Sequence, residues 1–298
     1  MSLFDRLVDQ ALSQQVDLAP LRVVVEKELL HHDVMRVLSD CGLLDTLCFI
    51  GGTCLRACYG SNRLSEDLDF TGGVNFDRAA LAQLKPLLTE RLQTKYGLAV
   101  EVSEPKKEVG NVDTWKLKVQ TRPEAKNLPA QRINIDVCSI PSYQPRANML
   151  LNPYGVDMGT AGLIVRAESL EEIYADKILA FGLRRGRIKN RDIWDLLWLK
   201  QRLIVPAFEL IPSKLDDHGV SAQVFLATAQ QRARSLVEDA NVKREFRLEM
   251  QRFLPAALVA ATVNDERFWA YLAAEIPALM REVTQRLDGK SSGPVFRM

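Results

Sequence analysis

The sequence has few of the residues that build metal-scaffolded or secreted domains, and it has no long apolar run. It contains three histidines and five cysteines in 298 residues, with no CxxC pair. Structural zinc usually takes four Cys or His ligands, so this composition argues against a zinc-built domain. No apolar run approaches the roughly 20 residues that span a bilayer. The charged N-terminal segment has no long apolar core, so we expect no secretory signal and no membrane partner.

The chain also lacks an excess of charge of either sign. Lys plus Arg is 39 and Asp plus Glu is 38, which gives a net charge of +1. Bulk charge therefore neither favours nor excludes a nucleic-acid partner, and only local clusters bear on that question. An odd cysteine count without framework spacing suits a reducing compartment, so we expect a cytoplasmic protein.

Apolar periodicity divides the chain into a mixed first part and a helical second part. Strands are predicted where apolar and polar residues alternate and helices where apolar residues recur at helical spacing. The segments predicted as strands lie at 47–50, 67–71, 98–102, 114–119 and 133–137. Helices are predicted at 3–41, 77–96 and from about 169 to 287, with breaks near Pro206, Pro212, Pro255 and Pro277, and loops at 123–129 and 141–155.

These patterns predict an α+β fold, a small mixed sheet with helices that is followed by a helical C-terminal lobe. We expect a catalytic domain at 1–165 and a helical lobe at 166–288 that completes the active-site cleft. The Gly-, Ser- and Pro-containing tail at 289–298 is expected to be disordered.

The strongest chemical signal is the pair of acids in Asp67-Leu68-Asp69. Residues i and i+2 of a strand point to one face, so the two carboxylates project together, about 7 Å apart at their Cα atoms. Two such carboxylates repel unless a cation lies between them, and Mg²⁺ is commonly held by one or two carboxylates plus substrate phosphates. A bare Asp-x-Asp is more often two acids on a solvated strand face, so its context decides.

That context includes a glycine turn upstream. Gly51 and Gly52 follow a short apolar strand, and Thr53 is expected to cap the helix that comes next. Backbone amides at a glycine turn and a helix start form an anion site. A polyphosphate on those amides and its metal ion on Asp67 and Asp69 would belong to one substrate.

A third acid, Asp136, lies on the polar side of the alternating strand at 133–137. Such a carboxylate is usually solvated. Beside an Asp pair, however, it would suit phosphoryl transfer, because it could hold a second ion and help to deprotonate the attacking hydroxyl. We therefore predict Asp67, Asp69 and Asp136 as metal-binding and catalytic residues.

The order of these motifs resembles a known family. Residues 49–60 (FIGGTCLRACYG) and 63–70 (RLSEDLDF) resemble the first motif of the AbiEii/AbiGii-type nucleotidyltransferase toxins, which belong to the DNA polymerase β-like superfamily. The family pattern is Gly-Gly-Thr, a helix, Arg-x-Ser and Asp-x-Asp-Phe. The resemblance implies that the nucleotide is bound by Gly51, Gly52, Thr53, Arg63, Ser65 and a later lysine, Lys177.

Two later segments also resemble family motifs. Residues 172–180 (EIYADKILA) resemble the helix that bears a functional lysine, here Lys177, and residues 191–196 (RDIWDL) resemble the Arg-Asp-x-x-Asp motif. The resemblance implies catalytic roles for Lys177 and Asp192, although a lysine on an apolar helix is by itself more often a surface residue with its ammonium in water. Asp192 and Asp195 are three apart and therefore share one helix face.

Between these motifs lies a basic run with five cations in the eight positions 184–191. A charge run is usually a solvated face, but this one could bind triphosphate or an RNA backbone. The predicted RNA contacts are Arg184, Arg185, Arg187 and Lys189.

The resemblance implies a toxin of a type IV toxin–antitoxin system, in abortive infection and antiviral defence, with an antitoxin encoded alongside. It would use Mg²⁺ or Mn²⁺ to transfer a nucleotidyl group from an NTP to an acceptor hydroxyl, with release of pyrophosphate. Some members modify the 3′ end of tRNA, so tRNA is the expected acceptor. The alternatives are nucleotidylation of a protein or a small molecule such as an aminoglycoside, or an inactive binding module.

Overall fold

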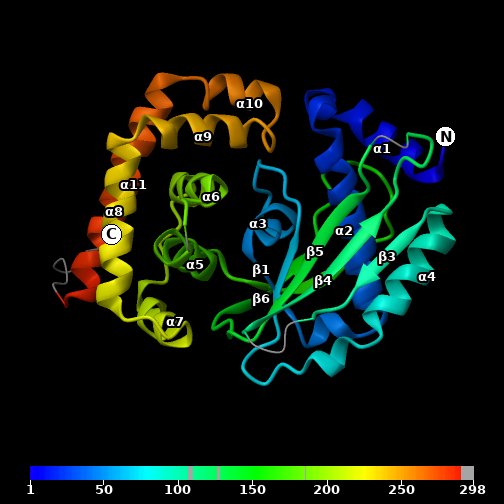
Figure 1. The fold of residues 1–298 in the computed structure, drawn as a ribbon, viewed down its shortest axis with the longest axis horizontal. Helices are drawn as coiled ribbons and strands as arrows, with labels where there is room; N and C mark the ends of the chain where they lie inside the picture. Colours follow the sequence, from blue (N-terminus) through cyan, green and yellow to red (C-terminus); the bar gives the residue numbers. More distant parts are fainter. Residues whose placement is uncertain (107–109, 126–127, 185, 290–298) are drawn as a thin grey trace. The chain divides into compact units, whose positions relative to one another are not determined.

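A computed structural model describes residues 1–106, 110–125, 128–184 and 186–289 (Figure 1). It divides into two units, which are described separately. The first comprises Met1–Ser169 and Phe253–Ala256, and the second comprises Leu170–Arg252 and the chain from Ala257 onward. The tail predicted at 289–298 lies, from residue 290, outside the described residues.

One mixed seven-stranded sheet forms the centre of the first unit, in the order β3-β4-β5-β2-β1-β7-β6 (Figure 1). β2 is parallel to β5 and β1 is parallel to β7, whereas the other neighbours are antiparallel. The predicted mixed sheet is thus confirmed. The strands are β1 (Cys48–Ile50), β2 (Leu68–Thr71), β3 (Val100–Ser103), β4 (Val112–Val119), β5 (Gln131–Cys138), β6 (Pro145–Met149) and β7 (Ile164–Glu168).

The two faces of the sheet differ because apolar and polar residues alternate along its central strands. On β5, Ile133, Ile135 and Val137 are buried, whereas the intervening Asn134 and Asp136 are only half-buried. The antiparallel neighbour β4 follows the same rule, with Trp115 buried. One face is therefore the core and the other carries polar side chains.

The core face is covered by helices. α2 contacts both β5 and α4, while α3 contacts β1 and β2. The predicted helix at 77–96 is interrupted, because Asp77 caps a short 3-10 turn through the N–H of Ala79 (2.9 Å) and α4 begins only at Leu84. The helices of this unit are α1 (Leu3–Gln14), α2 (Arg22–Asp40), α3 (Gly51–Tyr59) and α4 (Leu84–Tyr96), with 3-10 turns η1 (Val16–Leu21), η2 (Leu43–Asp45) and η3 (Arg78–Leu81).

All the secondary-structure elements described in the second unit are helices, which confirms the predicted helical C-terminal lobe. Its elements are α5 (Leu170–Leu183), α6 (Asn190–Gln201), η4 (Phe208–Leu210), α7 (Ile211–Asp217), α8 (Ala222–Glu238), α9 (Ala240–Met250), α10 (Ala256–Ala261) and α11 (Glu266–Leu287). The break predicted at Pro277 is wrong, because α11 runs through this residue. Across the residues that the structure describes, no helix is long and apolar enough to cross a membrane.

The loop predicted at 141–155 is also wrong in part, because it contains β6. This strand begins with a proline, lies at the edge of the sheet and is largely exposed. It therefore has no buried face and no alternation of apolar and polar residues to reveal it. Its pairing with β7, from Pro145 opposite Glu168 to Met149 opposite Ile164, is what makes it a strand.

Candidate active site

The acidic motif lies at the start of β2, as its sequence predicts. Leu68 and Phe70 face the core, where the Phe70 ring stacks on Phe49 with 5.1 Å between ring centroids. Asp69 alternates with them and is half-buried on the opposite, polar face. Asp67 directly precedes the strand, and its Oδ1 accepts a hydrogen bond of 3.0 Å from the N–H of Asn134 on β5.

Asp136 is placed beside Asp69. The two are register partners on the parallel strands β2 and β5, so their side chains leave the same face of the sheet. Thr114 of β4 is the register partner of Asp136 on the other side. Two predicted acids thus occupy adjacent positions in one polar row that crosses three strands.

The glycine turn meets this row at Asp69. Ile50, the last residue of β1, is the register partner of Asp69, and α3 starts immediately afterwards at Gly51. Gly51 has φ +76°, and a Cβ on it would lie 2.9 Å from Oδ2 of Asp69. A carboxylate of the acidic motif therefore packs directly against the turn that opens α3, as expected if both serve one substrate.

Thr53 has a different local role from the one predicted. It lies within the first turn of α3, whose N-cap is Ile50, so it does not cap the helix. Its hydroxyl donates to the carbonyl oxygen of Asp67 and lies 2.6 Å from Oγ of Ser65, which therefore donates to it. Thr53 and Ser65 are both buried and join α3 to the segment that precedes β2.

Arg63 is buried against the same turn. A Cβ on Gly52 would clash with Nη2 of Arg63, so glycine at this position makes room for the guanidinium. Nη1 of Arg63 donates to the carbonyl oxygen of Leu64 over 3.2 Å. The structure thus brings Gly52 and Arg63 into contact beside Gly51.

Lys177 and Asp192, in the second unit, are partners of each other. Nζ of Lys177 lies 2.7 Å from Oδ1 of Asp192 and 2.8 Å from Oδ2 of Asp195, and all three side chains are buried. Nε of Arg184 approaches the other oxygen of Asp192 at 2.7 Å. Two acids three residues apart on α6 do share a face, and that face meets the lysine of α5.

This cluster perturbs two pKa values. Burial by itself would raise the pKa of Asp192, but the neighbouring Lys177, Arg184 and Lys189 lower it well below the ordinary carboxyl range. Burial, with Arg184 and Arg191 nearby, lowers the pKa of Lys189 to about 8. Asp192 is therefore firmly ionised, whereas Lys189 loses its proton more readily than an exposed lysine.

The rest of the basic run is spread over different surroundings. Arg187 is exposed, Lys189 is half-buried, and Arg185 lies outside the described residues. Arg187 and Asn190 line a polar hollow of about 370 Å³ in the second unit, together with residues of α8 and α9. Arg232 of α8, also at this hollow, donates to the carbonyl oxygens of Phe181 and Arg184 and so satisfies the C-terminal end of α5.

The acids of the first unit fit a magnesium ion as a pair. Among the described residues, no three His, Cys, Asp or Glu side chains gather closely enough to hold an ion as they stand. Mg²⁺ needs only one or two carboxylates when substrate phosphates supply further oxygens. Asp69 and Asp136, side by side on the polar face with Asp67 directly before the strand, provide such oxygens.

The sequence matches the family described as "Nucleotidyl transferase AbiEii toxin, Type IV TA system" over residues 33–274. The chain belongs to this family. The predicted resemblance is confirmed, and the match covers both the acidic motif and the Lys177 and Asp192 motifs. An AbiEii protein is the toxin of a type IV toxin–antitoxin system, so an antitoxin partner is implied for this chain.

Two solved structures from Helicobacter pylori resemble this AbiEii chain. One is JHP933, with 16% identity and a TM-score of 0.46, covering 88% of this chain and 97% of that one. The other is described as a candidate nucleotidyltransferase, with 17% identity and a TM-score of 0.44, covering 89% of this chain and 99% of that one. No curated protein matches the sequence.

The sequence did not single out Glu28 and His31, which lie before residue 33, where the AbiEii match begins. Both are buried on α2 and contact the segment that leads into Asp67. Five buried ionisable residues interrupt the apolar pattern of α2: Glu26, Glu28, His31, His32 and Asp33. Ionisable side chains on the apolar side of a helix need partners, and that signal could have marked them.

Proposed function

We propose that this AbiEii chain transfers a nucleotidyl group from an NTP to the hydroxyl of an RNA acceptor, the 3′ end of tRNA, with Mg²⁺ (or Mn²⁺) as cofactor. The observation that carries the proposal is the position of Asp69. It stands beside Asp136 on neighbouring strands and packs against the Gly51 turn at the start of α3. An acid pair beside a glycine turn at a helix N-terminus suits an NTP and its metal ion.

The residues of the first unit divide the work of this reaction. Asp67 and Asp69, with Asp136 beside Asp69, would hold the ion, which would neutralise charge on the phosphates. The backbone amides at Gly51 and Gly52 face the phosphates. Thr53, Ser65 and Arg63 fix the glycine turn against the segment that precedes β2. The acceptor oxygen attacks the α-phosphorus, the bond from that phosphorus to pyrophosphate breaks, and the carboxylate of Asp136 accepts the hydroxyl proton.

The proposal gives the second unit the acceptor. Lys177 and Asp192 have the catalytic roles that the family resemblance implies. The RNA backbone is contacted by Arg184, Arg185, Arg187 and Lys189. The exposed Arg187 at a polar hollow supports this assignment. Because its proposed substrates, NTP and tRNA, are cytoplasmic, we propose that the protein acts in the cytoplasm.

The acceptor is tested by incubating the protein with each α-labelled NTP, Mg²⁺ and, in separate reactions, total RNA, total protein or an aminoglycoside. Label in tRNA-sized RNA supports the proposal. Label only in protein or in the aminoglycoside would replace RNA by that acceptor. In a further reaction, the RNA is first treated with periodate, which blocks its 3′ end. Incorporation of label into this blocked RNA would argue against the 3′ hydroxyl as the acceptor.

The contact between Gly51 and Asp69 predicts a selective loss of activity in Gly51→Ala. Alanine at φ +76° costs about 1–2 kcal/mol, and its Cβ would also press on the Asp69 carboxylate. Gly73 is a matched control, since it has φ +75° but nothing within 4 Å of an added Cβ. Both variants should lose stability in urea unfolding, Gly51→Ala by more because of this added contact, and at equal fraction folded only Gly51→Ala should lose transfer. Equal transfer in the two would contradict the role of this contact.

The RNA assignment predicts a loss that depends on salt. Each phosphate contact to single-stranded RNA contributes a slope of about −0.7 to the dependence of log binding constant on log salt. Arg187→Gln should therefore weaken tRNA binding and make this slope shallower by about that amount, with NTP binding unaffected. Binding is measured by fluorescence anisotropy between about 50 and 200 mM salt.

Arg281→Gln is the control, because Arg281 is an exposed arginine of the same unit on α11. It should leave both the affinity and the slope as in the wild type. If Arg187→Gln also left both unchanged, this surface would not be the RNA contact.

A further inference from the structure

The segment from Ser61 to Asp67, which leads into the acidic motif, belongs to no helix or strand. It is nevertheless largely buried, and three side chains of α2 hold it. Asp67 itself precedes the first residue of β2, so strand pairing does not fix its backbone. The N–H of Asn134 holds its carboxylate and Thr53 holds its carbonyl oxygen, so the residues before Asp67 are the remaining support for the position of this side chain.

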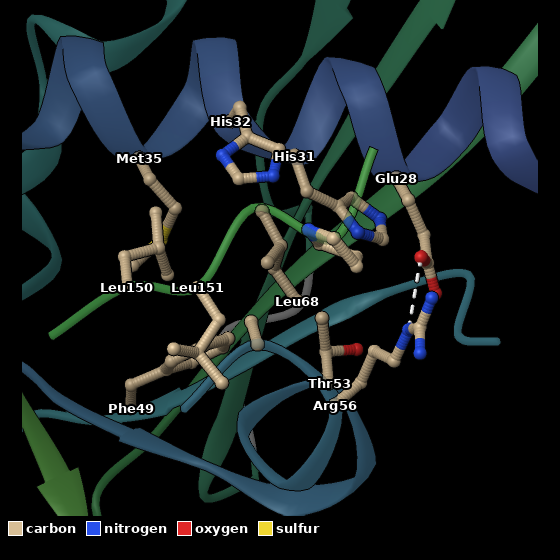
Figure 2. Close-up of a pocket in the computed structure, with 12 residues that line it drawn as sticks. Glu28, His31, His32, Met35, Phe49, Thr53, Arg56, Leu68, Leu150 and Leu151 are labelled. Atoms are coloured by element: carbon tan, nitrogen blue, oxygen red, sulfur yellow. Dashed lines mark hydrogen bonds and ion pairs between the residues drawn. The ribbon is translucent and has the colours of Figure 1, made fainter. Parts of the chain in front are cut away.

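Glu28 connects both ends of this segment. Its Oε1 accepts from the N–H of Ser65 at 2.8 Å. Its Oε2 accepts from Nε of Arg56 at 3.1 Å and from the hydroxyl of Tyr154, and Nη1 of Arg56 in turn donates to the carbonyl oxygen of Ser61 at 3.0 Å. Figure 2 shows Glu28 extending from α2 to meet Arg56 of α3 beside Thr53.

His31 and Lys27 hold the next residue, Glu66. Nε2 of His31 lies 3.0 Å from the carbonyl oxygen of Glu66, and Nζ of Lys27 lies 2.9 Å from its Oε1. A carbonyl oxygen only accepts, so Nε2 of His31 carries the hydrogen. Burial lowers the pKa of His31, which keeps the ring neutral, with that single N–H, near neutral pH.

We propose that Glu28 and His31 are positioning residues for the nucleotidyl-transfer site, which fix the backbone of Ser65 and Glu66 and thereby aim the carboxylate of Asp67. This inference rests on the proposed function. Neither residue lies in the segment that matches the AbiEii family. Reacting groups must be held within about 0.5 Å of the productive geometry, and residues locked by surrounding hydrogen bonds achieve this.

The first test compares Glu28→Gln with Glu26→Gln. Glu26 is an equally buried glutamate of α2, but its carboxylate accepts from Thr121 (3.1 Å) and Gln131 (2.6 Å), away from the acidic motif. A glutamine at 28 has one acceptor oxygen, so it cannot serve Ser65 on one side and Arg56 with Tyr154 on the other.

The expected result distinguishes an effect on the position of the Asp67 carboxylate from an effect on the stability of the fold. At equal fraction folded, Glu28→Gln should lower kcat on the order of 10²-fold with a much smaller change in KM for the NTP, because small misplacements cost that much. Glu26→Gln should keep the wild-type kcat. Hydrogen exchange followed by mass spectrometry should show faster exchange at residues 61–67 in Glu28→Gln only.

The second test uses the two adjacent histidines. His32 is as buried as His31, but its Nδ1 lies 2.8 Å from the hydroxyl oxygen of Thr160 instead of contacting the motif. His31→Leu should lower kcat, His31→Gln should restore most of it because its amide can donate to Glu66, and His32→Leu should leave kcat unchanged. A structural role alone would give the same kcat in both leucine variants.

Each outcome bears on a different claim. If the wild type transfers no label, the proposed function fails. If hydrogen exchange at residues 61–67 were unchanged in Glu28→Gln, then Glu28 would not fix this segment, whether or not the protein is active. An active wild type with equal kcat in Glu28→Gln and Glu26→Gln would overturn the positioning role while leaving the proposed function intact.

Discussion

Asp69→Asn is expected to lower nucleotidyl transfer on the order of 10²–10³-fold, a loss typical of removing one electrostatic contact to the transition state. Asp69 lies beside Asp136 and against the Gly51 turn, and in the proposed reaction its charge would serve the NTP and its ion. Asparagine keeps the shape of the side chain and removes repulsion between neighbouring acids. The free energy of unfolding should therefore be unchanged or slightly higher. Asp67→Asn should behave alike.

The control is a carboxylate of the same sheet that lies outside the polar row of Asp69 and Asp136. Asp113 of β4 is paired with Arg78, and Asp113→Asn should keep full transfer. Activity is measured with saturating NTP and Mg²⁺, and stability by urea unfolding of the same preparations. Full activity in Asp69→Asn, or equal losses in Asp69→Asn and Asp113→Asn, would remove the two-carboxylate mechanism.

Lys177→Met is expected to destabilise the second unit by about 3–5 kcal/mol, the usual cost of removing one partner from a buried ion pair. The side chains of Lys177, Asp192 and Asp195 are 9%, 3% and 0% exposed, so the variant leaves two carboxylates buried without their shared cation. The loss is measured by urea unfolding. If the free energy of unfolding stayed within about 1.4 kcal/mol of the wild type, which is a tenfold change in the equilibrium constant, the pair would not stabilise the fold.

The same pair predicts how stability depends on pH. Because the folded-state pKa of Asp192 is lowered, its contribution is fully present above the unfolded value of about 3.9 and is lost as pH falls through the lower folded value. Lys177→Met removes the main charge that lowers this pKa. Its acid unfolding should therefore begin at higher pH than that of the wild type.

Lys214→Met separates this stabilising role from nucleotide binding. Lys214 is also buried in the second unit and lies 2.7 Å from both Glu172 and Asp176. Both variants should lose similar stability. At equal fraction folded, only Lys177→Met should weaken the apparent affinity for NTP if Lys177 also acts in the proposed reaction. Equal affinities would leave Lys177 a purely structural residue.

Much of the first unit could be predicted because its strands alternate in burial. The alternation at 133–137 predicted which face Asp136 occupies, and the glycines at 51–52 predicted the turn. Strand β6 could not be predicted, because an exposed edge strand has no apolar face and exists through its partner β7. The pairing of Asp69 with Asp136 likewise depends on register, which a single sequence does not specify.

The features of the site that could not be predicted depend on contacts between residues that are distant in sequence. Local spacing suggested a capping role for Thr53, whereas the structure directs its hydroxyl to Asp67, fourteen residues away in sequence. Lys177 on an apolar helix was consistent with a surface lysine or a phosphate ligand, and its partners on α6 were not apparent. Glu28 could not be found from periodicity, because periodicity depends on apolar residues and does not reveal buried acids between them.

The proposed reaction transfers the α-phosphorus of the NTP to an acceptor, and the fate of labelled phosphate shows whether it does. Purified protein is incubated with tRNA, Mg²⁺ and the same NTP labelled either at the α- or at the γ-phosphate, with Asp69→Asn in parallel. We predict that α-label enters the tRNA 3′ end while γ-label is released as pyrophosphate, and that Asp69→Asn does neither. Transfer of γ-label to the acceptor, or α-label incorporation that persists in Asp69→Asn, would contradict it.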